Sequence, residues 1–369
     1  MGKCGNGENV ENVRVGLERM TEAPKNATLD ELAEMLASED EGLWREIFAA
    51  AREVKARCGK TEVLPRGLIE TSNICVKDCL YCGIRKGNAK VLRYLIPEEE
   101  VAQCIGEARR RGYPAVAFQA GEIESEANTA YYERILAMCR GMRRQECRRP
   151  ELGGGSAQEG GSALEVTLSL GEQTEEVYRR WKDAGAMRYL IRIETSNREL
   201  YAKIHPAECS FDRRLGCIRT LKKLGYVTGS GVMIGIPGQT IEDLARDIVF
   251  FGDERLDMVG MGPYIPHTAT PMGGESKSKD EVEDGIFRCS TSTLDFVCRM
   301  IALTRLYLHD VNIVAATALE ALDPTGGRNR GIEAGANVVM PVLTPEKYRS
   351  CYDLYPGKAG REGAPRTVA

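Results

Sequence analysis

Short apolar runs alternate with amphipathic helical patterns from residue 64 to residue 340. The runs are rich in aliphatic and β-branched residues, as expected of strands buried in a parallel sheet. They cover residues 64–70, 115–119, 164–170, 189–194, 231–236, 258–264, 312–316 and 337–340. The patterns between them predict helices over 97–111, 129–143, 174–184, 211–224, 240–251 and 292–308. Eight strands, each followed by a helix or a return connection, predict an α/β fold, a closed (β/α)8 TIM-type barrel rather than an open sheet.

The region before the first strand has a helical pattern of its own. Residues 28–57 predict two helices whose apolar residues recur on one face of each. We therefore assign residues 1–62 to an N-terminal helical extension and residues 63–358 to the barrel, and we expect the extension to lie in front of the barrel as a lid. The apolar residues are Leu29, Leu32, Met35 and Leu36 in the first helix and Leu43, Trp44, Ile47, Phe48 and Val54 in the second.

Two segments interrupt the barrel pattern. Residues 140–162 carry a cluster of charges followed by a Gly/Ser-rich stretch, and residues 273–290 are similarly polar. Both compositions are typical of surface insertions. Residues 359–369 show neither a helical nor a strand period and predict a flexible tail.

The composition narrows the class of protein. The chain has 369 residues, of which 43% are hydrophobic and 28% charged, as in an ordinary globular protein. Its net charge of −4 gives no overall attraction to nucleic acid, and no apolar run reaches the roughly 18 residues of a membrane span. The 13 cysteines follow no signal peptide and are odd in number, which argues against a disulfide framework. We expect a reducing compartment, the cytoplasm or an organelle matrix.

The clearest chemical signal is Cys75-Val-Lys-Asp-Cys79-Leu-Tyr-Cys82, directly after the first predicted strand. Three thiolates from one loop can bind three corners of a [4Fe-4S] cluster and leave the fourth iron without a protein ligand. A structural zinc site is the alternative, but zinc needs a fourth ligand, and His205, His267 and His309 show no matching spacing. The other cysteines show no ligand spacing and are interpreted as core or incidental thiols: Cys4, Cys58, Cys104, Cys139, Cys147, Cys209, Cys217, Cys289, Cys298 and Cys351.

This motif, with Tyr81 as the aromatic residue before Cys82, resembles that of the radical S-adenosylmethionine (SAM) superfamily. The resemblance implies that SAM binds the open iron and that one electron cleaves it to methionine and a 5′-deoxyadenosyl radical. It also implies that SAM is bound by residues at the strand ends, namely Tyr81, Gly121, Glu122, Arg192, Glu194 and Arg214. Two of these assignments have simpler alternatives. Arg192 and Glu194 share one face of a strand and can pair with each other, and Arg214 can be a solvated cation at a helix start.

Further strings resemble the HydE family of [FeFe]-hydrogenase maturases within this superfamily. They include RGLIETSNICVKDCLYCGIRKGN, VTLSLGE, RYLIRIETSN, GIPGQTIEDL and YDLYPGK, and the resemblance runs from about residue 30 to residue 358. It implies a small organometallic substrate, an iron carrying cysteine, carbon monoxide and cyanide, whose cysteine sulfur the radical attacks. The implied partners are a tyrosine-cleaving maturase, a scaffold GTPase and an electron donor. By motif position, the substrate chamber is lined by Arg66, Gln119, Met233, Thr317 and Tyr352.

The chain departs from the family pattern in two places. No cysteine follows Lys358, so we expect no auxiliary cluster, and Ala316-Thr317 stands where two threonines can occur. Three alternative functions remain open. The first is a sulfur insertion as in biotin synthase, which needs ligands for a second, sacrificial cluster. The second is a carbon-skeleton rearrangement as in methylornithine synthase. The third is a non-catalytic iron-sulfur scaffold, which needs no enclosed SAM pocket.

Overall fold

The structure, a computed structural model, describes residues 6–141, 164–274 and 292–358. The predicted insertions at 140–162 and 273–290 lie outside the described residues except at 140, 141, 273 and 274. The predicted tail at 359–369 also lies outside them.

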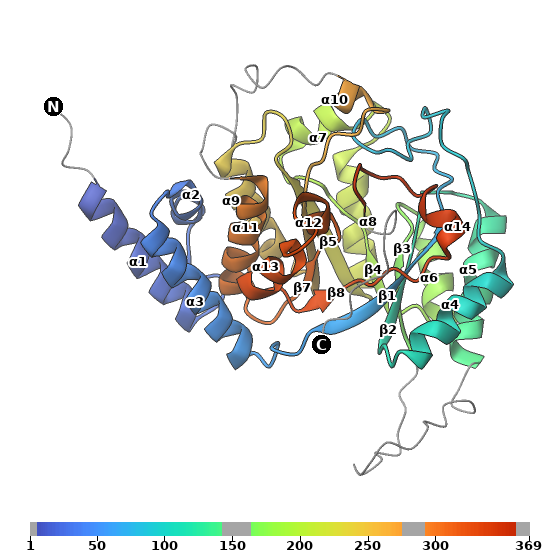
Figure 1. The fold of residues 1–369 in the computed structure, drawn as a ribbon, viewed down its shortest axis with the longest axis horizontal. Helices are drawn as coiled ribbons and strands as arrows, with labels where there is room; N and C mark the ends of the chain where they lie inside the picture. Colours follow the sequence, from blue (N-terminus) through green and yellow to red (C-terminus); the bar gives the residue numbers. More distant parts are fainter. Residues whose placement is uncertain (1–5, 142–163, 275–291, 359–369) are drawn as a thin grey trace, which may run out of the picture.

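Eight parallel strands form a closed barrel in sequence order (Figure 1). The predicted (β/α)8 architecture is therefore confirmed. Each strand pairs with the next, and the pairing of Leu64 with Val338 joins the first strand to the last. The strands are β1 (Leu64–Ser72), β2 (Ala115–Ala120), β3 (Glu165–Ser169), β4 (Arg188–Leu190), β5 (Val227–Ile234), β6 (Met258–Pro263), β7 (Asn312–Ala315) and β8 (Val338–Val339).

Two strand boundaries differ from the predicted ones by four residues, and each for a physical reason. β4 ends at Leu190 instead of residue 194, since Glu194 adopts a left-handed backbone with φ 68° and keeps only a single bridge to Val232. β5 begins at Val227, four residues before the predicted start. Its glycines hide the apolar pattern, and Gly231 is needed there because a Cβ atom would lie 2.0 Å from the Gly260 carbonyl oxygen of β6.

Helices surround the barrel, and several begin at a side chain that caps the free N–H groups of the first turn. Thr28 and Thr240 form capping boxes, while Asp40 and Ser292 accept backbone hydrogen bonds. The helices after β1 are α4 (Glu98–Arg110), α5 (Glu126–Gly141), α6 (Glu175–Ala184), α7 (Arg198–Ile204), α8 (Phe211–Lys223), α9 (Ile241–Asp253), α10 (Pro271–Gly274), α11 (Thr293–Leu308), α12 (Ala318–Leu322), α13 (Gly327–Ala334) and α14 (Glu346–Arg349). Among the described residues, no helix is both long and apolar enough to span a membrane.

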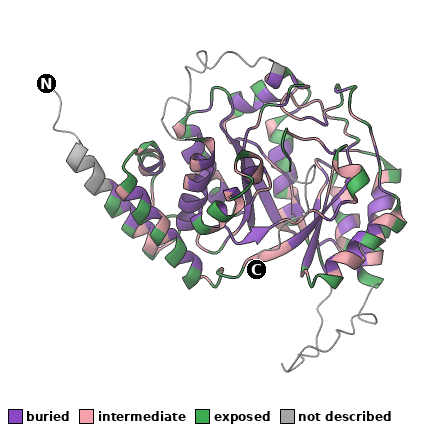
Figure 2. Ribbon diagram, in the orientation of Figure 1, coloured by how far each residue is buried: buried purple, intermediate pink, exposed green. Residues whose placement is uncertain are grey.

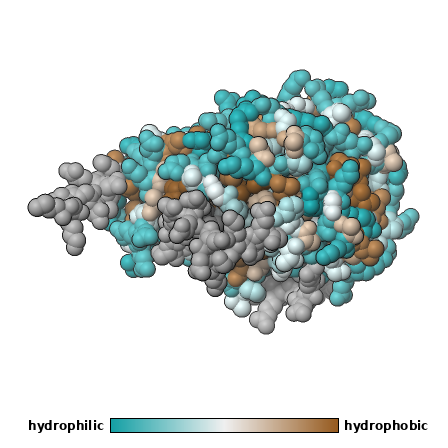
Figure 3. Space-filling view, turned by 90° about the horizontal axis from the view of Figure 1, so that it is seen from above, coloured by the Kyte–Doolittle hydropathy of each residue, from teal (hydrophilic) through white to brown (hydrophobic). Residues whose placement is uncertain are grey.

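Three helices precede the barrel, α1 (Asn6–Glu22), α2 (Leu29–Ala37) and α3 (Glu41–Arg57). The expectation that they form a lid is wrong. α2 packs on α9, and α3 packs on α11 and α13, so they lie along the flank of the barrel, as Figure 1 shows. Their buried faces join the main apolar core, which is formed by residues of the strands and of the helix faces that pack on them (Figure 2). Hydrophilic residues dominate the face seen in Figure 3, with apolar residues in separate patches.

A buried carboxylate in α9 makes stability depend on pH. Asp247 is fully buried, and its Oδ1 accepts hydrogen bonds from the Ser196 N–H and hydroxyl at 2.6 Å. Its Oδ2 has no hydrogen-bond partner among the described residues. Burial raises the pKa of Asp247 from 3.8 to about 7. The folded state therefore favours the neutral acid, and stability falls as pH rises from about 4 through about 7.

Asp247→Asn keeps the shape of the neutral acid at every pH. We expect it to be more stable than wild type at both pH values, with a gain about 2 kcal/mol larger near pH 8.5 than near pH 5, because the unfolded carboxyl is already largely ionised at pH 5. Thermal unfolding followed by circular dichroism at both pH values measures this difference. Asp30→Asn, at an exposed position in α2, is the control and should change little. An equal gain at both pH values would show that the charge of Asp247 is not the cause.

Candidate active site

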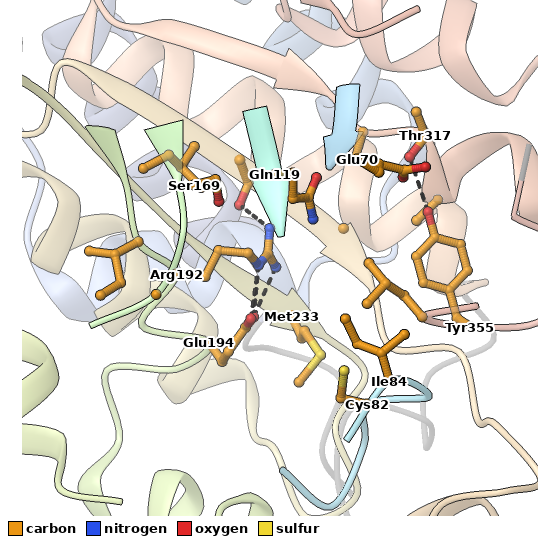
Figure 4. Close-up of a pocket in the computed structure, with 18 of the residues that line it drawn as sticks. Glu70, Cys82, Ile84, Gln119, Ser169, Arg192, Glu194, Met233, Thr317 and Tyr355 are labelled. Atoms are coloured by element: carbon orange, nitrogen blue, oxygen red, sulfur yellow. Dashed lines mark hydrogen bonds and ion pairs between the residues drawn. The ribbon is translucent and has the colours of Figure 1, made fainter. Parts of the chain in front are cut away.

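A cavity of about 350 Å³ opens at the carboxyl ends of the strands. This is the end of a (β/α)8 barrel where chemistry is found. All the residues predicted from the sequence for cluster, cofactor and substrate line it: Cys75, Cys79, Cys82, Tyr81, Gly121, Glu122, Arg192, Glu194, Arg214, Arg66, Gln119, Met233, Thr317 and Tyr352. Figure 4 shows Cys82 at one end, Arg192 and Glu194 on one side, and Glu70, Thr317 and Tyr355 on the other.

Hydrogen bonds from side chains to backbone carbonyl oxygens hold the cysteine loop at the cavity. The Asn73 amide donates to the carbonyl oxygens of Leu92 at 2.8 Å and Cys351 at 2.7 Å. Arg93 donates to the carbonyl oxygens of Asn73 at 2.6 Å and Ile84 at 2.7 Å. These bonds fix both ends of the loop and tie it to the C-terminal segment, which lies at the same end of the barrel.

The three thiols of this loop are desolvated. Burial raises the pKa of Cys75 and of Cys79, and it raises the pKa of Cys82 to about 12. Such thiols stay protonated at neutral pH unless a strongly positive centre binds them and displaces the protons. In the described part of the chain, no three His, Cys, Asp or Glu side chains are placed to hold one metal ion. Three such thiols at one cavity are the soft ligands that the iron atoms of a [4Fe-4S] cluster require.

Two carboxylates and three cations lie beside the cysteines. Glu122 Oε1 lies 3.1 Å from Lys77 Nζ, and Glu122 Oε2 accepts the Glu172 N–H at 2.8 Å. Glu172 is fully buried and is surrounded by Arg214 Nε at 2.5 Å, Arg213 Nε at 3.1 Å and Lys77 Nζ at 3.3 Å. Burial raises the pKa of Glu122. Burial acts the same way on Glu172, but Arg214 and Lys77 outweigh it and the pKa of Glu172 falls.

A second charged group lies across the cavity. Arg192 Nε is 3.0 Å from both carboxylate oxygens of Glu194, so the two residues do pair, as the simpler interpretation allowed (Figure 4). Arg192 also donates to the Gly260 and Val232 carbonyl oxygens at 3.1 and 2.7 Å. Glu194 has the left-handed backbone described above, which costs a non-glycine residue on the order of 1 kcal/mol and persists where surroundings enforce it. The pair is therefore a rigid feature of the cavity wall.

Tyr81 joins this pair to a histidine. Its hydroxyl lies 3.5 Å from Glu194 Oε1 and 3.3 Å from His205 Nε2. Burial, aided by Arg214, lowers the pKa of His205 to about 4, so the ring is neutral. His205 Nδ1 lies 2.9 Å from the Tyr201 carbonyl oxygen, which can only accept, so Nδ1 carries the proton and Nε2 is an acceptor. The single Tyr81 hydroxyl proton therefore has two acceptors in reach, His205 Nε2 and Glu194 Oε1.

The predicted substrate chamber lies deeper and contains few charges. Arg66 is buried, and its Nη1 contacts Met258 Sδ at 3.0 Å. The Thr317 and Tyr355 hydroxyls are 3.0 Å apart. The chamber therefore offers the Arg66 cation and several neutral donors to a small polar ligand, beside the Glu70–Lys358 ion pair that also lines the cavity.

The chain matches the radical SAM superfamily over residues 69–251. It is 41% identical over 333 residues to the [FeFe] hydrogenase maturase subunit HydE of Thermotoga maritima, which covers 90% of this chain and 84% of that protein. The chain belongs to the radical SAM superfamily. Biotin synthase of Persephonella marina is 31% identical over 114 residues, covering 31% of this chain and 33% of the synthase. The crystal structure of methylornithine synthase (PylB) superposes with a TM-score of 0.74 at 21% identity, covering 95% and 91% of the two chains, and shows the shared fold.

The residues of this radical SAM enzyme fit the cofactors of the superfamily. Cys75, Cys79 and Cys82 are three soft ligands at one cavity, as a [4Fe-4S] cluster with one open iron requires. Glu122 Oε1 faces the Lys77 ammonium at 3.1 Å and accepts no hydrogen bond of good geometry among the described residues, which suits a group that binds an ammonium. Arg214 provides a buried guanidinium for a carboxylate. The cluster and SAM are thus the cofactors of this enzyme.

Several residues of the cavity were missed from the sequence. Glu70, Lys77, Lys358 and Tyr355 line it, and Glu172 supports it from behind. Lys358 is buried against Glu70 in an ion pair that joins the C-terminal segment to β1. One signal was available: Gly171-Glu172 follows β3 as Gly121-Glu122 follows β2. The other residues show no pattern by which sequence alone places them at the cavity.

Gly121 keeps the cysteine loop in place. A Cβ atom at Gly121 would lie 2.2 Å from the Ile74 carbonyl oxygen and 2.8 Å from Cys75 Cβ. Gly121→Ala should therefore push the loop away and reduce the iron content of the reconstituted protein at least about fivefold, since backbone atoms cannot rotate aside. Gly216→Ala, at a helical position in α8 with open space around it, is the matched control and should retain iron. Iron and sulfide analysis measures both, and full iron content in Gly121→Ala would contradict the close contact.

Proposed function

We propose that this enzyme is a HydE-type maturase, which uses radical SAM chemistry on an iron-cysteine precursor of the [FeFe]-hydrogenase active site. The observation that supports this most directly is one cavity, in which a three-cysteine loop, the charged residues around Glu122 and Arg214, and an inner chamber with the buried Arg66 adjoin one another. The extent of the similarity to HydE supports the same conclusion. A non-catalytic scaffold has no need for the enclosed charges around Glu122, Glu194 and Arg214.

The protein's own groups have separate tasks in this function. Cys75, Cys79 and Cys82 hold the cluster, and Glu122 and Arg214 bind the ammonium and carboxylate of SAM. Once the cluster has been reduced by one electron, the cluster and SAM together would supply homolytic cleavage of the sulfonium. Tyr81, Arg192 and Glu194 form the fixed wall beside the reacting end. Because Met233 and Tyr352 are buried at the cavity, they exclude water from it.

The inner chamber fits the proposed substrate chemically. Arg66 and Gln119 offer N–H donors to cyanide or to the cysteine carboxylate, and Thr317 offers a hydroxyl. Met233 provides a soft, polarizable contact. With Ala316 beside Thr317, this chain has one hydroxyl at that place instead of two. The tyrosine-cleaving maturase, the scaffold GTPase and an electron donor are the partners that such a reaction needs.

A sulfur-insertion reaction is less well supported. Of the cysteines that the structure describes, only Cys75, Cys79 and Cys82 line the cavity, while Cys217 and Cys298 are buried in helices around the barrel. A sacrificial second cluster would need further ligands beside the substrate. The similarity to biotin synthase also covers a smaller share of the chain than the similarity to HydE.

The test is a comparison of substrates on one preparation. The protein is reconstituted anaerobically with iron and sulfide and mixed with SAM and dithionite, and 5′-deoxyadenosine is measured by chromatography. A synthetic iron complex of cysteine, carbon monoxide and cyanide should be consumed together with SAM, whereas dethiobiotin and lysine should not. Coupled consumption of dethiobiotin or lysine would replace this proposal by one of the two alternatives, and no 5′-deoxyadenosine at all would favour the scaffold.

A further inference from the structure

We propose that Lys77 is an internal substitute for the SAM ammonium, which holds Glu122 while the site is empty and moves onto Glu172 when SAM binds. Glu172 is the positioning residue that receives Lys77 and keeps Arg214 in place. The inference rests on the proposed function, because it takes Glu122 and Arg214 as the groups that bind the amino-acid end of SAM.

The two oxygens of Glu122 are held in different ways. Oε2 accepts an aligned hydrogen bond from the Glu172 N–H at 2.8 Å. Oε1 faces Lys77 Nζ at 3.1 Å but receives no aligned hydrogen bond among the described residues. A buried carboxylate without a counter-ion is strongly unfavourable, so the empty site needs this lysine. Since Lys77 contacts only Oε1, another ammonium can replace it there while Oε2 stays fixed.

Lys77 has a second carboxylate within reach. Its Nζ lies 3.3 Å from Glu172 Oε2, so a small rotation of the side chain transfers it fully from Glu122 to Glu172. Lysine suits this movement because it is a point charge on a flexible stem. The transfer leaves no buried charge unpaired, because the arriving ammonium neutralises Glu122 as Lys77 leaves it.

Two hydrogen bonds hold the guanidinium of Arg214 in place. Its Nε donates to Glu172 Oε1 at 2.5 Å and its Nη1 to the Arg192 carbonyl oxygen at 2.7 Å. Its Nη2 makes no hydrogen bond with the residues that the structure describes, so it is available to a carboxylate. The guanidinium is rigid and keeps two bonds while it uses a third, which a lysine cannot do.

Lys77 also lies between Cys75 and Cys79 in the cluster loop. The same geometry also fits a second role for Lys77, a permanent brace that ties the loop to Glu122 and Glu172. The two roles predict opposite effects on ligand affinity. A competitor for Glu122 weakens SAM binding when it is present, whereas a brace strengthens it.

The experiment measures binding of S-adenosylhomocysteine, which carries the same amino-acid end, to the reconstituted holoenzyme by calorimetry, with affinities compared at equal iron content. Lys77→Met should bind it about fivefold more tightly than wild type, because the competing cation is gone. Without ligand, Lys77→Met should unfold at a lower temperature than wild type, and saturating ligand should close most of that gap. Lys86→Met, at an exposed position on the same loop, is the control and should leave affinity and unfolding temperature unchanged.

Two further variants keep the test decisive if Lys77→Met loads iron poorly. Lys77→Arg places a forked, more tightly held cation between the two carboxylates and should weaken binding about tenfold. Glu172→Gln removes the second carboxylate, so Lys77 stays on Glu122, and binding of S-adenosylhomocysteine should also become weaker. Weaker binding in Lys77→Met, or unchanged or tighter binding in Lys77→Arg, overturns the inference and favours the brace. Absence of any binding by wild-type holoenzyme refutes the proposed function instead.

Discussion

Cys79→Ala should abolish SAM cleavage while the barrel stays folded. Removing one of three ligands leaves two thiolates, which cannot keep a [4Fe-4S] cluster with a single open iron. Cys79 makes no hydrogen bond that a strand or helix depends on, and its thiol is desolvated at the cavity wall. We expect at least a thousandfold less 5′-deoxyadenosine, roughly the loss seen when an essential catalytic group is deleted. Circular dichroism should show an unchanged unfolding temperature for the protein before reconstitution.

The matched control is Cys58→Ala. Cys58 is a free, partly buried cysteine at the C-terminal end of α3, outside the cavity. It should retain iron, sulfide and full SAM cleavage. If Cys79→Ala still released 5′-deoxyadenosine at the wild-type rate, the assignment of the cluster ligands would be wrong.

The barrel was predictable because strands buried on both faces appear as continuous apolar runs. β4 was misjudged at its end, since Arg192 and Glu194 continue the alternating pattern while the backbone at Glu194 has already left the sheet. β5 was misjudged at its start, where Thr228, Gly229 and Ser230 lower the hydrophobicity of a buried strand. α1 was missed as well, because most of its residues are polar.

The site was predictable as a set of residues but not as a set of partners. The carboxyl ends of parallel strands meet, so polar residues after each strand share one cavity. Which charges pair depends on distances that sequence does not contain. The links of Lys77 to Glu172 and of Lys358 to Glu70 join segments 95 and 288 residues apart. The position of the N-terminal helices was misjudged for the same reason, because an apolar helix face predicts burial but not the surface that buries it.

Arg66 is a cation that the fold itself does not neutralise. It is buried, and it forms no ion pair among the described residues. Burial lowers the pKa of Arg66 to about 10, helped by repulsion from Arg188 and opposed by Glu165. The folded state therefore disfavours the charge, and the guanidinium costs stability at neutral pH. A residue that destabilises its own protein at the floor of a cavity is expected to bind an anionic or strongly polar ligand.

Arg66→Met should consequently separate stability from function. We expect the variant to be more stable by roughly 1–3 kcal/mol, since an apolar side chain of similar length replaces an unpaired buried charge. SAM cleavage without substrate should continue at close to the wild-type rate, because Arg66 belongs to the inner chamber and the cysteine loop is untouched. Consumption of the iron-cysteine complex should fall about a hundredfold or more, as for loss of a charged donor. Thermal unfolding and the ratio of complex consumed to 5′-deoxyadenosine released measure the two effects. Arg66→Lys keeps the positive charge but not the forked guanidinium, so its stability and its consumption of the complex should lie between those of wild type and Arg66→Met. If Arg66→Met still consumed the complex at the wild-type ratio to 5′-deoxyadenosine, Arg66 would have no role in binding the substrate.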